Sequence, residues 1–154
     1  MPNLYFDGKY SNRIHKFVQE KYDDTDKTVF ETLYHFMVFL AMIGRNNHQN
    51  CNNIEIKDRT NEILDSRFVQ NDLDGIAYLL AIENAQDGNI LREGNEKQLW
   101  KYLENFAALG MEELDTWLEE SPSLDPRDVV LSKMQEIALD DITPDNDEKL
   151  KPIW

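Results

Sequence analysis

Apolar positions recur along this chain at the three- and four-residue spacing of an α-helix, in stretches that polar residues interrupt. The first stripe runs from Ile14 to Tyr22. A second helix is predicted from about Lys27 to Ile43, because Gly44 follows it and glycine often ends a helix in the left-handed conformation. Residues 36–43 of this helix are apolar on every side, which predicts a buried, central helix or one face of an oligomer interface.

The pattern changes after this helix. Residues 45–53 contain five asparagines, a residue that favours turns, and predict a polar loop. Residues 54–57 alternate between isoleucine and charged side chains, which predicts a short extended segment. Residues 58–70 fit neither the helical nor the strand period and stay unassigned.

Helical spacing returns in the second half of the chain. The apolar stripes lie at residues 73–81, 99–107, 114–118 and 129–138. Gly110 is predicted to end the second of these helices, and Asp125-Pro126 to begin the last, because proline suits the first helical position. The pattern therefore predicts a mainly α fold, a compact bundle of about five to six helices with a short extended segment near 54–57.

Composition fits one globular domain. Of the 154 residues, 41% are hydrophobic, which is enough for a core. No internal repeat or low-complexity linker divides the chain, so a single helical domain over residues 1–154 is expected, with a polar tail from about residue 140. The longest apolar run, residues 36–43, is far shorter than the roughly 20 residues that span a bilayer. With one cysteine, Cys51, and no signal-peptide pattern, a cytoplasmic protein without a membrane partner is expected.

Charge divides the chain into two unlike halves. Residues 1–70 hold 9 Lys or Arg and 10 Asp or Glu, whereas residues 71–154 hold 7 and 20. The second half would repel phosphate backbones and could attract a basic protein, although acidic residues can also simply solvate helices. The candidate interface residues are aromatic side chains and carboxylates of the predicted helices: Phe36, Phe39, Glu112, Glu113, Trp117, Glu119 and Glu120.

Candidate catalytic chemistry is sparse. His48-x-x-Cys51 supplies two of the four ligands that structural zinc needs, and no glycine-rich turn indicates an oxyanion hole near the thiol. Glu55-Ile56-Lys57 resembles the E-x-K half of a metal-dependent nuclease site, which also needs an aspartate on a neighbouring strand. The nearest upstream aspartates, in residues 23–26, precede a predicted helix. No catalytic, metal-binding or cofactor-binding residue is therefore predicted, and no cofactor.

Contact with nucleic acid is a further use open to the first half. Its candidate contacts are the four cations in the middle of the chain: Arg45, Lys57, Arg59 and Arg67. Acidic residues are interleaved with them and would have to turn away for these cations to bind phosphates.

Two stretches carry a family resemblance. One reads Phe39-Leu40-Ala41-Met42-Ile43-Gly44, and the other reads Ile76-Ala77-Tyr78-Leu79-Leu80-Ala81-Ile82-Glu83, then Asp87, Ile90-Leu91 and Glu104-Asn105-Phe106-Ala107-Ala108-Leu109-Gly110-Met111. They resemble Dnd system-associated protein 4, a bacterial DNA phosphorothioation-associated family, over about residues 28–118. The resemblance implies a protein encoded beside systems that modify DNA with sulphur and restrict unmodified phage or plasmid DNA. It implies no catalytic residue. The family's basic cluster after the glycine is reduced here to Arg45.

Three functions follow from these patterns. The first is a non-enzymatic accessory component of a bacterial DNA-modification or anti-phage defence system, acting through contact with a basic protein partner. The second is a DNA-binding or regulatory module that uses the nearly neutral first half. The third is a metal-dependent nuclease centred on Glu55 and Lys57. A homo-oligomer is compatible with each.

Overall fold

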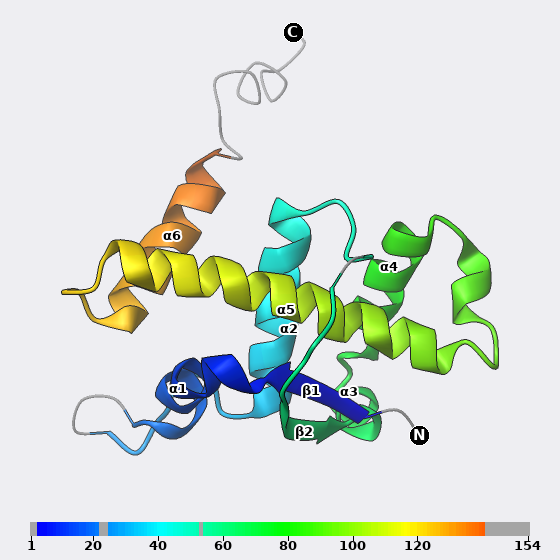
Figure 1. The fold of residues 1–154 in the computed structure, drawn as a ribbon, viewed down its shortest axis with the longest axis horizontal. Helices are drawn as coiled ribbons and strands as arrows, with labels where there is room; N and C mark the ends of the chain where they lie inside the picture. Colours follow the sequence, from blue (N-terminus) through cyan, green and yellow to red (C-terminus); the bar gives the residue numbers. More distant parts are fainter. Residues whose placement is uncertain (1–2, 22–24, 53, 141–154) are drawn as a thin grey trace, which may run out of the picture. The chain divides into compact units, whose positions relative to one another are not determined.

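The computed structural model describes residues 3–21, 25–52 and 54–140 (Figure 1). Within these residues, six α-helices and one two-stranded sheet confirm the predicted mainly α class. The elements are β1 (Asn3–Asp7), η1 (Gly8–Tyr10), α1 (Ser11–Ile14), η2 (His15–Gln19), α2 (Leu33–Asn47), β2 (Arg59–Leu64), α3 (Asp65–Gln70), α4 (Asp74–Ala85), η3 (Gly88–Leu91), α5 (Glu96–Glu120) and α6 (Pro126–Asp140).

The chain divides into two compact units, Met1–Glu113 and Leu114–Trp154. The first unit holds the sheet, α1 to α4 and most of α5, and the second holds the end of α5 together with α6. The single domain expected from the sequence stays a prediction. Most of the expected polar tail lies outside the described residues.

The extended segment expected near 54–57 is a strand that begins slightly later. Residues 54–57 have no regular structure, and β2 starts at Arg59. Its antiparallel partner is β1, which the helical pattern had not revealed. Leu4 and Phe6 of β1 are buried and Tyr5 between them is not, as expected for a strand with one face on the core.

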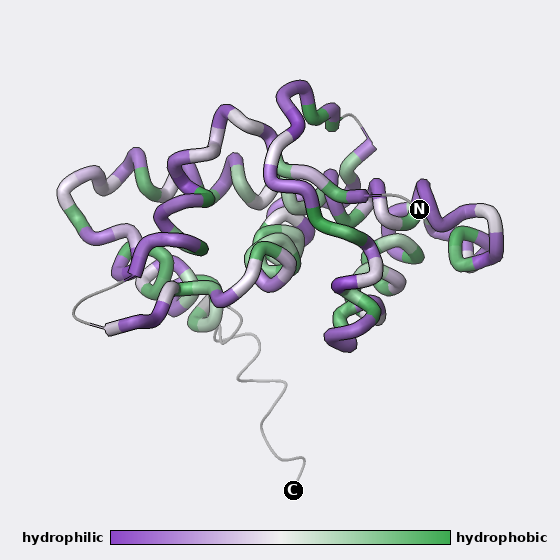
Figure 2. The backbone as a smooth tube through the Cα atoms, turned by 90° about the horizontal axis from the view of Figure 1, so that it is seen from below, coloured by the Kyte–Doolittle hydropathy of each residue, from purple (hydrophilic) through white to green (hydrophobic). Residues whose placement is uncertain are grey.

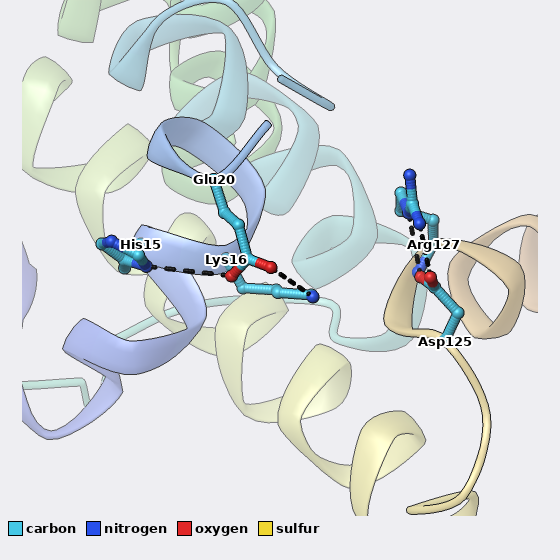
Figure 3. Close-up of polar contacts among 5 residues, drawn as sticks. All are labelled: His15, Lys16, Glu20, Asp125 and Arg127. Atoms are coloured by element: carbon cyan, nitrogen blue, oxygen red, sulfur yellow. Dashed lines mark hydrogen bonds and ion pairs between the residues drawn. The ribbon is translucent and has the colours of Figure 1, made fainter. Parts of the chain in front are cut away.

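The first predicted stripe forms two consecutive turns of different type. The α-helical turn of α1 continues into a π-helical turn, η2, and the buried residues Ile14 and Phe17 come from these two elements. On the outer side, Glu20 lies 2.9 Å from the Lys16 ammonium and 4.0 Å from His15 Nδ1 (Figure 3). Exposed pairs of this kind each contribute little to stability.

The second predicted helix starts six residues later than expected, at Leu33 rather than near Lys27. Thr32 is the N-cap, because its hydroxyl oxygen accepts the His35 backbone N–H at 3.1 Å. The residues before it instead form a bridge between Lys21 and Thr28. Several residues before Leu33 suit an N-cap, so the apolar spacing alone could not select the helix start.

Two glycines that were predicted to end helices lie inside them. Gly44 lies within α2, and Gly110 lies within α5, so the two helices predicted around this glycine are one. The cause is a close crossing of α2 and α5 (Figure 1). A Cβ atom on Gly44 would lie 2.9 Å from the Gly110 nitrogen, and one on Gly110 would lie 2.9 Å from Leu40 Cα. Each helix needs glycine here because a side chain would strike the other backbone.

The core of the first unit is built around Phe36 of α2. Its ring centroid lies 5.9 Å from that of Phe6, 5.7 Å from Phe17 and 5.1 Å from Phe30. Figure 2 shows α2 nearly end-on and coloured mainly as hydrophobic. Burial of this helix is confirmed for most of residues 36–43, although Met42 is 57% exposed.

Two further predictions concern the later helices. The helix predicted over 73–81 is α4, which ends at Ala85 and is capped by Gln86 in the left-handed conformation. The start of α6 is confirmed: the Asp125 carboxylate accepts the Arg127 backbone N–H at 2.9 Å and also pairs with the Arg127 guanidinium (Figure 3). No helix in the described residues is long and apolar enough to cross a membrane.

Candidate functional site

Strand β1 borders a cleft of about 320 Å³, here called the mixed cleft. It is lined by residues of β1 and η1, of the segment before β2 and of α5: Tyr5, Phe6, Asp7, Lys9, Tyr10, Ile54, Glu55, Ile56, Lys57, Glu104, Ala107, Ala108, Met111 and Glu112. Its charged side chains are of both signs. The cleft therefore carries no excess of positive charge.

A second hollow, of about 310 Å³, shares Tyr5 and Glu104 with the mixed cleft. It is lined by Asn3, Tyr5, Arg59, Lys97, Trp100, Lys101 and Glu104, and is here called the basic hollow. Three of its residues are cations and one is an acid. The hollow is thus a locally positive feature on a chain with a net charge of −14.

Glu104 lines both hollows, and its side chain is already paired. Its side chain is 5% exposed; one carboxylate oxygen accepts the Tyr5 backbone N–H at 2.8 Å and the other accepts from the Lys101 ammonium at 2.9 Å. The strand pairing shifts at Tyr5, opposite the left-handed Asn61 with φ 54°, so this N–H is available to α5. Glu104 therefore fixes β1 against α5, as a buried carboxylate with charge-assisted hydrogen bonds can.

The four predicted nucleic-acid contacts do not come together. Lys57 lines the mixed cleft and Arg59 lines the basic hollow, whereas Arg67 on α3 lines neither. Arg45 pairs with Glu83, with 2.6 Å between Nε and the carboxylate oxygen. Sequence reasoning missed Lys97 and Lys101. Their four-residue spacing within a helix was the available signal that they share one face.

The predicted interface residues differ in how far they are exposed to solvent. Phe36 is fully buried among aromatic rings, so it is a core residue and not a surface contact. Trp117 is 4% exposed. Phe39 is half-buried and lines a shallow apolar groove together with Phe30 and Met42. Of the carboxylates, Glu113 is half-buried and the other three are exposed: Glu112, Glu119 and Glu120.

The groups suspected of metal or nucleophile chemistry do not assemble a centre. Cys51 is 1% exposed, its backbone N–H donates to the Asn84 side chain at 3.0 Å, and His48 is exposed. In residues 3–21, 25–52 and 54–140, no group of three or more His, Cys, Asp or Glu side chains is placed to hold a metal ion.

Burial raises the pKa of the Cys51 thiol from 9.0 to about 12, so the thiol stays protonated in the folded protein at neutral pH. We expect alkylation by iodoacetamide to be slow in the native state at pH 8 and to reach the rate of a free thiol in denaturant. Because the folded pKa is the higher one, stability should hold below pH 9 and fall between pH 9 and 12. Fast native labelling would contradict the buried, neutral thiol.

The fold and the two hollows define a small, mainly α-helical protein with a cation-lined surface site and no metal centre in its described residues. A comparison with known protein families matches residues 10–152 to DNA sulphur modification system-associated protein 4, and the chain belongs to this family. The resemblance found in the sequence is thereby confirmed over a longer stretch. No curated protein and no solved structure matches the chain. The family name indicates association with a DNA sulphur modification system and suggests an accessory role.

Proposed function

We propose that this chain is a non-catalytic accessory component of a DNA sulphur modification system and acts by contact with a basic protein partner. The main support is the charge at the end of α5. Residues 112–120 carry five carboxylates and no lysine or arginine, and the last helical turn has no basic residue.

This arrangement opposes the helix dipole. The C-terminal end of a helix carries partial negative charge, so cations there stabilise and anions destabilise by about 0.3–1 kcal/mol each. Repulsion among neighbouring carboxylates adds to that cost. Cations of a bound partner would relieve both effects, and the complex would be more stable than the sum of its surface contacts suggests.

The second unit as a whole carries a net negative charge. Between Leu114 and Trp154 there are 11 Asp or Glu and 4 Lys or Arg. Lys133 lies 3.7 Å from Glu120 and 3.6 Å from Glu136, and Arg127 pairs with Asp125, so two of these four cations are already engaged within the chain. The net charge available to a partner is therefore negative, which favours fast, salt-sensitive association with a basic surface.

A pull-down from the host at low and at high salt tests this function. We expect a basic protein of the modification system to be recovered at low salt and lost at high salt. Glu119→Gln combined with Glu120→Gln should reduce recovery several-fold. The matched control is Glu31→Gln with Glu93→Gln, which removes the same charge from exposed positions outside α5 and should leave recovery unchanged. Recovery that is absent at every salt concentration, or equal for both variants, would contradict the proposal.

A further inference from the structure

We infer that the basic hollow of the first unit binds a phosphate group. This inference goes beyond the proposed protein contact and does not depend on it, because it concerns other residues. The hollow draws side chains from three elements: Asn3 and Tyr5 from β1, Arg59 from β2, and Lys97 and Lys101 from the first two turns of α5. Strand pairing and the packing of β1 on α5 bring them together from distant parts of the sequence.

The charges of the hollow leave two cations without a carboxylate. Glu104 is its one acidic lining residue, and both of its oxygens are occupied by Lys101 and by the Tyr5 backbone N–H. In the described part of the chain, neither Arg59 nor Lys97 has an ion-pair partner. Both are exposed to solvent. Acidic residues outnumber basic ones by 30 to 16 in this chain, so two unneutralised cations at one hollow indicate an anionic ligand.

The geometry around Arg59 favours phosphate over a spherical anion. Its guanidinium lies over the Tyr5 ring, with 5.5 Å between the guanidinium carbon and the ring centroid. A cation–π contact of this kind holds the guanidinium beside the ring and leaves its N–H donors free for two parallel hydrogen bonds to phosphate oxygens. Lys97 adds a point charge beside it. The positive end of the α5 dipole contributes in the same direction, because Lys97 belongs to the first turn of that helix.

Acidic residues near the basic hollow are held elsewhere or lie in the mixed cleft, so the excess of positive charge is confined to the basic hollow. Glu62 accepts hydrogen bonds from the Asn3 amide and, at 3.3 Å, from the Tyr5 hydroxyl, so it is held at the strand surface. In the mixed cleft, Lys57 lies among the carboxylates of Asp7, Glu55 and Glu112 and gives no cationic excess. A phosphate on the basic hollow would therefore be bound mainly by Arg59 and Lys97, with Lys101 shared with Glu104.

Titration calorimetry on the purified full chain at low salt tests the inference with three probes: inorganic phosphate, a 5′-mononucleotide and a short DNA duplex. Arg59→Gln combined with Lys97→Gln should weaken binding by at least about tenfold, since each charge-assisted hydrogen bond is lost. The matched control is Lys27→Gln with Arg67→Gln, which changes the net charge equally at exposed residues outside the hollow and should change affinity less than about twofold.

The three probes identify the source of the phosphate. Binding of the duplex alone assigns the site to a DNA backbone, and its affinity should fall steeply with salt. Binding of phosphate and mononucleotide as well assigns it to a small phosphorylated ligand; either result supports the inference. No binding of any probe, or equal weakening by the two double variants, overturns it. If the double variant fails to fold by circular dichroism, Lys97→Gln alone replaces it, because Lys97 is exposed and its charge is unpaired.

Discussion

Alanine in place of Gly110 is expected to destabilise the first unit by about 3 kcal/mol or more, because the added methyl group meets backbone that cannot move aside. The Cβ of that alanine would lie in the space of the Leu40 carbonyl group and 2.9 Å from Leu40 Cα. Helices α2 and α5 would have to separate at the point where they cross. For a chain of this length the loss corresponds to a melting temperature lower by roughly 6–12 °C, which calorimetry or thermal circular dichroism measures.

The control is the same substitution at Gly75. This glycine lies in α4, and a Cβ there would meet nothing within 4 Å. Alanine at this position should stabilise the protein by about 0.4–1 kcal/mol, because it lowers the conformational entropy of the unfolded chain. If Gly110→Ala lowers the stability and Gly75→Ala raises it, the helix crossing, and not helix propensity, is the reason that position 110 requires glycine. An unchanged melting temperature for Gly110→Ala would refute the crossing.

The same glycines explain where sequence reasoning about the fold reached its limit. The apolar spacing correctly indicated most of the helices and the mainly α class, since this information is local. Gly44 and Gly110 look like helix ends when only neighbouring residues are considered. Each must be glycine because it contacts the backbone of the other helix, and the two glycines are 66 positions apart in the sequence. The ends of α2 and α5 were therefore predicted wrongly, because the contact between these helices cannot be read from neighbouring residues.

The strand pair was hidden for a related reason. β1 offers two buried positions, Leu4 and Phe6, and β2 reads Arg-Thr-Asn-Glu-Ile-Leu with a shift in its register. No tight turn joins the two strands, because residues 8–58 separate them in the sequence. Short alternation without a hairpin signal is weak evidence for strands.

The candidate site shows the same division between local and distant information. Arg45, Lys57, Arg59 and Arg67 were grouped because they are close in sequence, but Arg45 pairs with Glu83 and Arg67 lies outside both hollows. Arg59 instead meets Lys97 and Lys101 through the packing of β1 and β2 beside α5. That any of these cations contacts an anion stays a prediction. Which of them share a surface was a property of the tertiary fold.

The second large effect is expected for Phe36→Ala, which should cost about 3–5 kcal/mol. Phe36 is fully buried and packs against the rings of Phe6, Phe17 and Phe30, so its removal leaves a cavity that three rigid aromatic side chains fill poorly. Urea unfolding monitored by tryptophan fluorescence measures the loss as a lower midpoint with a similar slope.

Phe39→Ala is the matched comparison, on the same helix and of the same chemistry. Phe39 is half-buried, with its ring centroid 4.9 Å from that of Phe30, so its removal should cost only about 1–2 kcal/mol. The two variants separate packing from association. The loss of stability in Phe36→Ala should be independent of protein concentration, because the ring is inside the first unit. If a second copy of the chain covers the groove at Phe39, the effect there must grow with protein concentration, since an interface stabilises by mass action and a core does not.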